Sequence, residues 1–153
     1  MYGKILVALE NGPADRSLIP HIQELASLLG SSLLLVHVAD GWAARHYERL
    51  RLAESEEMKA DRLYLEEVAA RFQAAGLTVA TLLALGDPPQ EILKTAERER
   101  CDLIAMTTHG HRLLSDVIFG CTITHVRHRT NIPMLLVRAE HLAPERKQAA
   151  EES

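Results

Sequence analysis

The chain has 153 residues and a mass of 17.0 kDa, which is the usual size of one domain. Its net charge of −4 argues against nucleic acid as a partner, because phosphate binding favours a basic face. Cys101 and Cys121 form no CxxC pattern, so we expect a reducing compartment rather than a disulfide framework. No run approaches the ~18 apolar residues of a membrane span, and no signal-peptide pattern is present, so we expect a cytoplasmic protein without a membrane partner.

The first half of the chain alternates between strand and helix patterns. Residues Lys4–Leu9 (KILVAL) are continuously apolar, which is typical of a strand buried on both faces of a parallel sheet. Asp15 is predicted to cap a helix that runs to Leu29, where apolar residues recur at helical spacing, and Gly30 is predicted to end it. Ser32–Val38 (SLLLVHV) is a second predicted buried strand.

The same alternation continues in the second half. After a polar, weakly periodic segment at residues 40–54, the remaining predicted elements are a long amphipathic helix at Glu54–Ala75, a strand at Leu77–Ala84, a helix with proline near its start after Gly86, a strand at Cys101–Thr107, a helix entered at Gly120 that reaches His128, and a strand at Ile132–Arg138.

This alternation predicts an α/β fold. We expect one domain at residues 1–140, with a polar tail at residues 141–153, built on a doubly wound five-stranded parallel sheet with helices on both faces (Rossmann-like). The predicted strand order is 3-2-1-4-5. Ligands of such sheets bind beyond the carboxyl ends of the strands, where the order reverses. The reversal falls between strands one and four, so we expect the ligand near Leu9–Glu10 and Thr107–Gly110.

The segment MTTHGHRLLSDVIFGCT, from Met106 to Thr122, contains two glycines suited to a phosphate loop. Gly110 directly follows a predicted strand, and Gly120 opens a predicted helix. Glycine lets backbone amides approach a phosphate, and a helix N-terminus favours an anion. The spacing alone leaves two interpretations open: a phosphate cradle or two turn glycines.

Nearly the full length resembles the universal stress protein family, through KILVAL, LLLVHV, LGDPPQEIL, CDLIAMTTHG and IPMLLVR. Nucleotide-binding members of that family carry Gly-x-x-Gly, nine residues, then Gly-Ser or Gly-Thr. Here the same frame reads TTHG, HRLLSDVIF, GC. Thr107 stands in place of the first glycine, and Cys121 replaces the hydroxyl residue. The family usually has aspartate where this chain has Glu10.

The resemblance implies that the ligand is an adenine nucleotide. This is either ATP, bound with or without magnesium, or AMP. It also implies a homodimer formed through the fifth strand, Ile132–Arg138. Arg112 is either a further phosphate contact or a solvated loop residue. The binding residues implied by the resemblance are Ala8, Glu10, Val38, Met106, Thr107, His109, Gly110, Gly120, Cys121 and Thr122.

The two departures from the family frame have different expected effects. Threonine is strained only where the backbone needs a positive φ, and we predict that Thr107 instead ends strand four. Cys121 lacks a hydroxyl donor but keeps its backbone amide. One lost neutral hydrogen bond weakens binding by roughly two- to tenfold.

The residues of this segment suggest three other chemistries. His109-Gly110-His111 is one residue short of the His-x-Gly-His motif of nucleotidyltransferases and follows strand four rather than strand one. The four histidines between residues 109 and 128 do not converge as a zinc site requires, so we expect no metal site. Cys121 at a helix N-terminus suits a redox-sensitive thiol, but no histidine–acid pair can be assigned to it.

The sequence therefore predicts a nucleotide-binding stress-response protein that acts as a dimeric sensor or signalling module toward an unknown protein partner. We expect no catalytic residues and at most slow ATP hydrolysis. The alternative is a dimeric interaction module of the same fold that has lost nucleotide binding.

Overall fold

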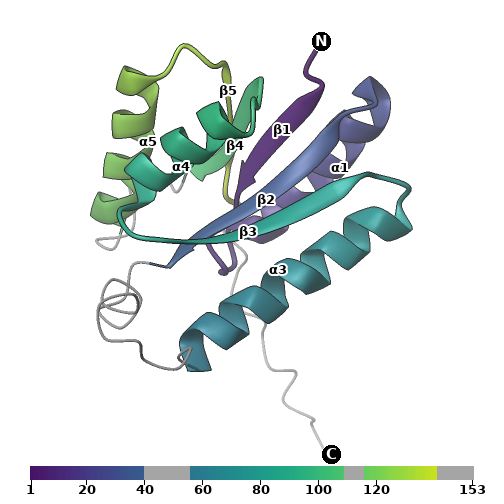
Figure 1. Cartoon of the computed structure of the whole chain (residues 1–153), viewed down its shortest axis with the longest axis horizontal. Coiled ribbons are helices and arrows are strands. Elements are labelled where there is room, and N and C mark those ends of the chain that lie inside the picture. Colours follow the sequence, from purple (N-terminus) through teal and green to yellow (C-terminus); the bar gives the residue numbers. More distant parts are fainter. Residues whose placement is uncertain (40–55, 109–115, 141–153) are drawn as a thin grey trace, which may run out of the picture.

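Five parallel strands form one sheet in the order β3-β2-β1-β4-β5 (Figure 1), which confirms the predicted order. The computed structural model describes residues 1–39, 56–108 and 116–140, with the backbone alone for residues 116–121. The predicted polar segment at residues 40–54 and the predicted tail at residues 141–153 lie outside the described residues. Each strand agrees with its predicted range to within two residues: β1 (Lys4–Ala8), β2 (Ser32–Ala39), β3 (Val79–Leu85), β4 (Leu103–Thr108) and β5 (Met134–Arg138).

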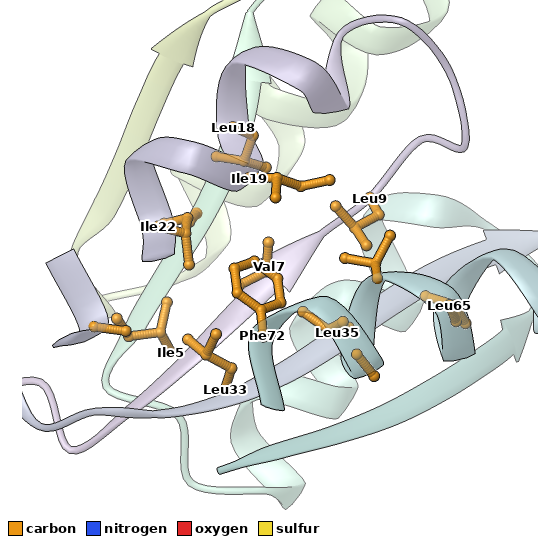
Figure 2. Packing of buried hydrophobic residues seen from close by; sticks show 14 of the residues in the cluster. Ile5, Val7, Leu9, Leu18, Ile19, Ile22, Leu33, Leu35, Leu65 and Phe72 are labelled. Carbon is orange, nitrogen blue, oxygen red and sulfur yellow. The ribbon is translucent and has the colours of Figure 1, made fainter. Parts of the chain in front are cut away.

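Helices cover both faces of the sheet, as predicted. On one face α1 (Asp15–Leu29) and α3 (Glu56–Ala74) pack over alternate strand residues, and Figure 2 shows Ile19 of α1 and Phe72 of α3 on either side of Val7 within one cluster. On the other face α4 (Pro88–Arg98) and α5 (Asp116–Arg129) cover the intervening strand residues. Because both faces are buried, the strands are continuously apolar rather than alternating. No helix among the described residues is long and apolar enough to cross a membrane.

The helix ends show where local sequence rules held and where they failed. Gly30 adopts a left-handed conformation (φ 68°) and ends α1 as predicted, with its N–H donating to the Ala26 carbonyl. The predicted cap at Asp15 is wrong, because Ala14 occupies the N-cap position without a side-chain cap and Asp15 is the first helical residue. The predicted helix entry at Gly120 is also wrong, because α5 begins about one turn earlier, at Asp116.

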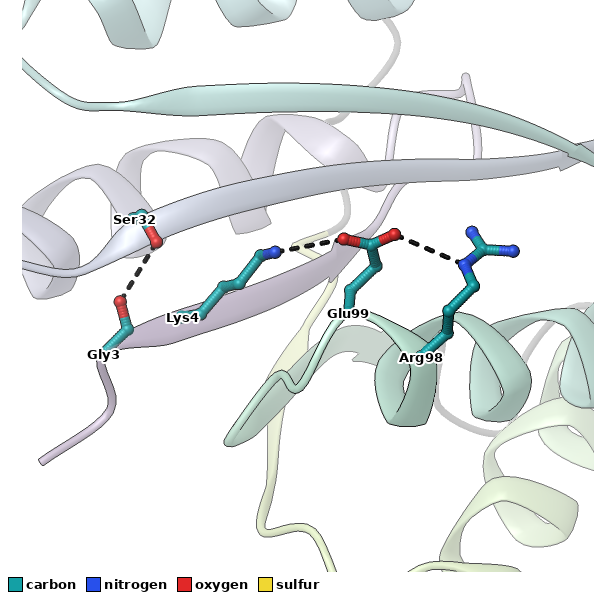
Figure 3. Close-up of polar contacts among 5 residues, drawn as sticks. All are labelled: Gly3, Lys4, Ser32, Arg98 and Glu99. Carbon is teal, nitrogen blue, oxygen red and sulfur yellow. Dashed lines mark hydrogen bonds and ion pairs between the residues drawn. The ribbon is translucent and has the colours of Figure 1, made fainter.

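The amino ends of the central strands are fastened by polar contacts (Figure 3). The Ser32 hydroxyl donates to the Gly3 carbonyl (3.1 Å), while Glu99 at the end of α4 pairs with Lys4 Nζ (3.3 Å) and Arg98 Nε (3.3 Å). Hydrogen bonds from Lys4 and then Arg98 lower the pKa of the Glu99 carboxyl. These contacts lie at the opposite end of the strands from the predicted ligand position, so we assign them to the scaffold.

Candidate functional site

A cavity of about 180 Å³ lies at the carboxyl ends of the central strands, on the face covered by α4 and α5. It lies where the sequence predicted it, because β1, β2 and β4 end side by side and the strand order reverses between β1 and β4. Its lining residues come from these three strand ends, from the start of α4 and from α5: Ala8, Leu9, Glu10, Val36, His37, Val38, Pro88, Ile92, Met106, Thr107 and Thr122.

Six of the ten residues implied by the resemblance are brought together in this cavity: Ala8, Glu10, Val38, Met106, Thr107 and Thr122. His109 and Gly110 lie outside the described residues. Gly120 and Cys121 lie within the backbone of α5, in a part whose side chains are not described. A helix leaves the amides of its N-cap and of its first three residues without an intrahelical partner, so in α5 these include residues 116–118 but neither Gly120 nor Cys121.

Leu9 also lines the cavity, as the predicted strand order led us to expect, and four lining residues were not predicted: Val36, His37, Pro88 and Ile92. Two of them carry a signal that could have been used. Val36 precedes Val38 by two residues and therefore shares its face of β2, and Ile92 follows Pro88 by one helical turn. The inclusion of His37 depends on how the β1–α1 loop lies against β2, which no local pattern predicts.

The cavity combines an apolar wall with a few polar groups. Ala8, Val36, Ile92 and Met106 are buried apolar residues of the core on this face. The Thr107 hydroxyl donates to Glu10 Oε1 (3.2 Å). Thr107 lies inside β4 and is not among the positive-φ residues, so the prediction that it continues strand four is confirmed. Its hydroxyl therefore helps to hold a carboxylate at the cavity wall.

The β1–α1 loop, which carries Glu10, is held by a buried carboxylate. Asp15, only 1% exposed, accepts hydrogen bonds from the backbone N–H groups of Glu10 (3.0 Å) and Asn11 (2.9 Å). It also accepts from the Tyr64 hydroxyl (2.6 Å). Burial first, and then the hydrogen bond to Asp15, raises the pKa of Tyr64 well above its usual value. Asp15 thus organises the loop instead of capping α1.

A second polar chain supports the same loop from β2 and α3. His37 Nδ1 donates to the Leu9 carbonyl (2.8 Å), which can only accept, and His37 Nε2 lies 3.4 Å from Asp61 Oδ2. Asn11 donates through Nδ2 to Asp61 Oδ1 (2.6 Å) and adopts φ 58°. The loop is therefore fixed in position by α1, α3 and β2 together, which lowers the ordering cost of binding a ligand beside it.

This arrangement suits part of a ligand rather than a whole one. Typical ligand pockets have ~300–1,000 Å³, and this cavity is smaller, so it fits one small, largely apolar group with polar atoms near Glu10 and Thr107. Within the described parts of the chain, no cluster of three or more His, Cys, Asp or Glu residues is placed to hold a metal ion.

The fold is that of a doubly wound α/β protein with a cavity at its strand carboxyl ends. The model of the universal stress protein family matches residues 1–138, and the chain belongs to that family. It is 24% identical to universal stress protein MJ0577 of Methanocaldococcus jannaschii, over 92% of this chain and 98% of that protein.

Solved structures agree with this assignment. The structure of MJ0577 superimposes with a TM-score of 0.77 at 25% identity, covering 92% of this chain and 99% of that one. A universal stress protein in complex with cAMP gives 0.64 at 18% identity, covering 91% and 98%. The Archaeoglobus fulgidus universal stress protein in complex with dAMP gives 0.65 at 18% identity, covering 89% and 98%. At 18% identity, the last two comparisons show that the fold is shared.

Proposed function

We propose that the chain binds an adenine nucleotide, ATP or AMP, with the base in the cavity and the ribose beside Glu10. The observation that carries this proposal is the convergence of six implied binding residues on one apolar cavity with a fixed carboxylate. The cAMP and dAMP complexes of proteins with this fold support the choice of an adenine nucleotide. A carboxylate accepts hydrogen bonds from ribose hydroxyls, and an apolar slot accepts the base.

In this proposal the phosphates extend from the cavity toward the segment that follows β4. His109 and Gly110 would form the first phosphate turn, and Gly120, Cys121 and Thr122 the second contact, with or without magnesium. Thr122 is buried and lines the cavity, which supports its part in this set. We assign no catalytic step to these residues, and at most slow ATP hydrolysis.

The proposed role of the chain is that of a cytoplasmic stress-response module that works as a homodimer. β5 lies at the edge of the sheet, and Leu136 within it is 42% exposed. An apolar edge strand is prone to association, and pairing with a second copy through residues 132–138 would cover it. Nucleotide binding would then shift the population of surfaces offered to a protein partner.

Filling the cavity tests the nucleotide site. Ala8 is 7% exposed and lines the cavity, so Ala8→Leu places three further carbon atoms where the base is expected. We expect AMP affinity, measured by calorimetry, to fall at least about tenfold. Ala70→Leu adds the same atoms at an exposed position of α3 and should leave affinity unchanged. Equal AMP affinity in the two variants would show that the base does not bind in this cavity.

The alternative, an interaction module without nucleotide, is favoured by one observation. α5 begins at Asp116, so the Gly120 and Cys121 amides fall after the four that a helix leaves without a partner. Such a protein would show no AMP or ATP binding near millimolar concentration while keeping its dimeric state in sedimentation.

A further inference from the structure

A second hollow lies on the opposite face of the sheet from the nucleotide cavity, between α1 and α3. It is an open groove of about 650 Å³, within the ~300–1,000 Å³ range of ligand sites. None of the nucleotide-site residues proposed above lines it. Its residues come from the β1–α1 loop, α1 and α3: Asn11, Gly12, Pro13, Arg16, Ile19, Pro20, Tyr64, Glu67, Val68 and Arg71.

The groove has an apolar floor and charged sides. Ile19 and Val68 are buried members of the core beneath it, and Figure 2 shows Ile19 on the side of α1 that faces α3. Arg16 and Arg71 are exposed, and among the described residues neither guanidinium forms an ion pair. With Glu67 counted, the groove carries a net positive charge on a chain of net charge −4.

Pro20 is an exposed residue on the α1 side of the groove. It lies inside α1 and has no N–H, so the Arg16 carbonyl lacks the donor that it would find four residues later in an uninterrupted helix.

We infer that this groove docks an acidic segment of a partner protein, with apolar side chains on Ile19 and Val68 and carboxylates at Arg16 and Arg71. Guanidinium groups suit carboxylates because their donors match both oxygens. The net positive charge of the groove favours an acidic segment over a basic one.

The groove also borders the loop of the nucleotide cavity. Asn11 and Tyr64 line the groove and Glu10 lines the cavity, and all three donate to the one Asp15 carboxylate. The proposed docking rests on the proposed function, in which a nucleotide state is passed to a partner, and it places that partner against the loop that both sites share.

The test uses nucleotide-free full-length protein and a fluorescent peptide that alternates leucine with glutamate. Anisotropy should show binding, and the same peptide with lysine for glutamate should not bind. Arg16→Glu and Arg71→Glu should each weaken binding about fivefold or more. Lys94→Glu makes the same charge change at an exposed position of α4, on the other face, and should leave binding within about twofold.

Amide shifts in NMR spectra locate the peptide and separate the other occupants. Changes centred on Asn11, Gly12 and Val68 are expected. Equal binding by wild type, Arg16→Glu and Arg71→Glu, or shifts elsewhere, would overturn the proposal. Displacement of the peptide by inorganic phosphate, with shifts at the same amides, would also overturn the proposal. Self-association of the protein that is abolished by both Arg16→Glu and Arg71→Glu would overturn it as well. AMP binding by the same sample is measured in a separate titration. A loss of peptide binding can therefore be distinguished from a loss of nucleotide binding.

Discussion

Replacing Asp15 by asparagine removes the charge that organises the β1–α1 loop while keeping the shape of the side chain. All three observed partners of Asp15 are donors: two backbone N–H groups and the Tyr64 hydroxyl. An asparagine presents one oxygen and one NH₂ group, so at least one donor would face another donor. The side chain is 1% exposed, so water cannot replace the lost acceptor without rearrangement.

The expected loss of stability follows from these contacts. A hydrogen bond to a charged group contributes about 1.5–3 kcal/mol, and a buried donor left unsatisfied costs about 1–3 kcal/mol. The two remaining bonds would also weaken from charged to neutral. We therefore expect Asp15→Asn to lower the free energy of unfolding by about 3 kcal/mol, a large part of the ~5–15 kcal/mol of a typical domain.

Urea unfolding of Asp15→Asn, with the m-value unchanged, measures this loss. Asp87→Asn is the matched control, because Asp87 is an exposed N-cap that accepts from the Gln90 N–H and asparagine caps helices equally well. The control should stay within about 0.5 kcal/mol of the wild type. A similarly small change in Asp15→Asn would refute the assignment of Asp15 as the organiser of the loop.

Three further predictions concern single side chains. The raised pKa of Tyr64 means that the folded state holds the phenol proton more tightly, so stability present below pH ~10 is lost as the pH rises above it. As the pH rises above ~10, the urea midpoint of the wild type should therefore fall more than that of Tyr64→Phe. Equal falls of the two midpoints would contradict this prediction. Thr107→Val removes the hydroxyl that holds Glu10 and should weaken AMP binding about two- to tenfold by calorimetry, whereas unchanged affinity would show that this bond is dispensable. Burial raises the pKa of the Cys101 thiol, so iodoacetamide should label its peptide slowly in the native protein and quickly in urea. Equal labelling rates would show that the thiol is accessible.

The sheet could be predicted from the sequence because its signal is local and repeated. Each strand is a continuous apolar run, and each is separated from the next by a helix-forming stretch, so one topology satisfied the whole pattern. The position of the cavity followed from the strand order alone, and Ala8, Val38 and Met106 lie there because they are near strand ends.

The polar support of the site could not be predicted in the same way. Asp15 looked like a helix cap, since aspartate before an apolar period is a common start signal. Its actual partners include Tyr64, which is 49 residues away in the sequence, and Asp61 reaches Asn11 across 50 residues. Such contacts depend on α3 packing beside α1. The predicted start of α5 is too late because Gly120 is a common boundary signal, whereas a helix tolerates an internal glycine at a modest cost.

The most direct test of the central claim is to identify and titrate the nucleotide. Acid release from freshly purified protein followed by mass spectrometry should yield ATP or AMP, and titration of either into the emptied protein should give a dissociation constant in the micromolar range. Absence of released nucleotide, together with no binding near millimolar ATP or AMP, would contradict the account and leave a family member that acts through its surfaces alone.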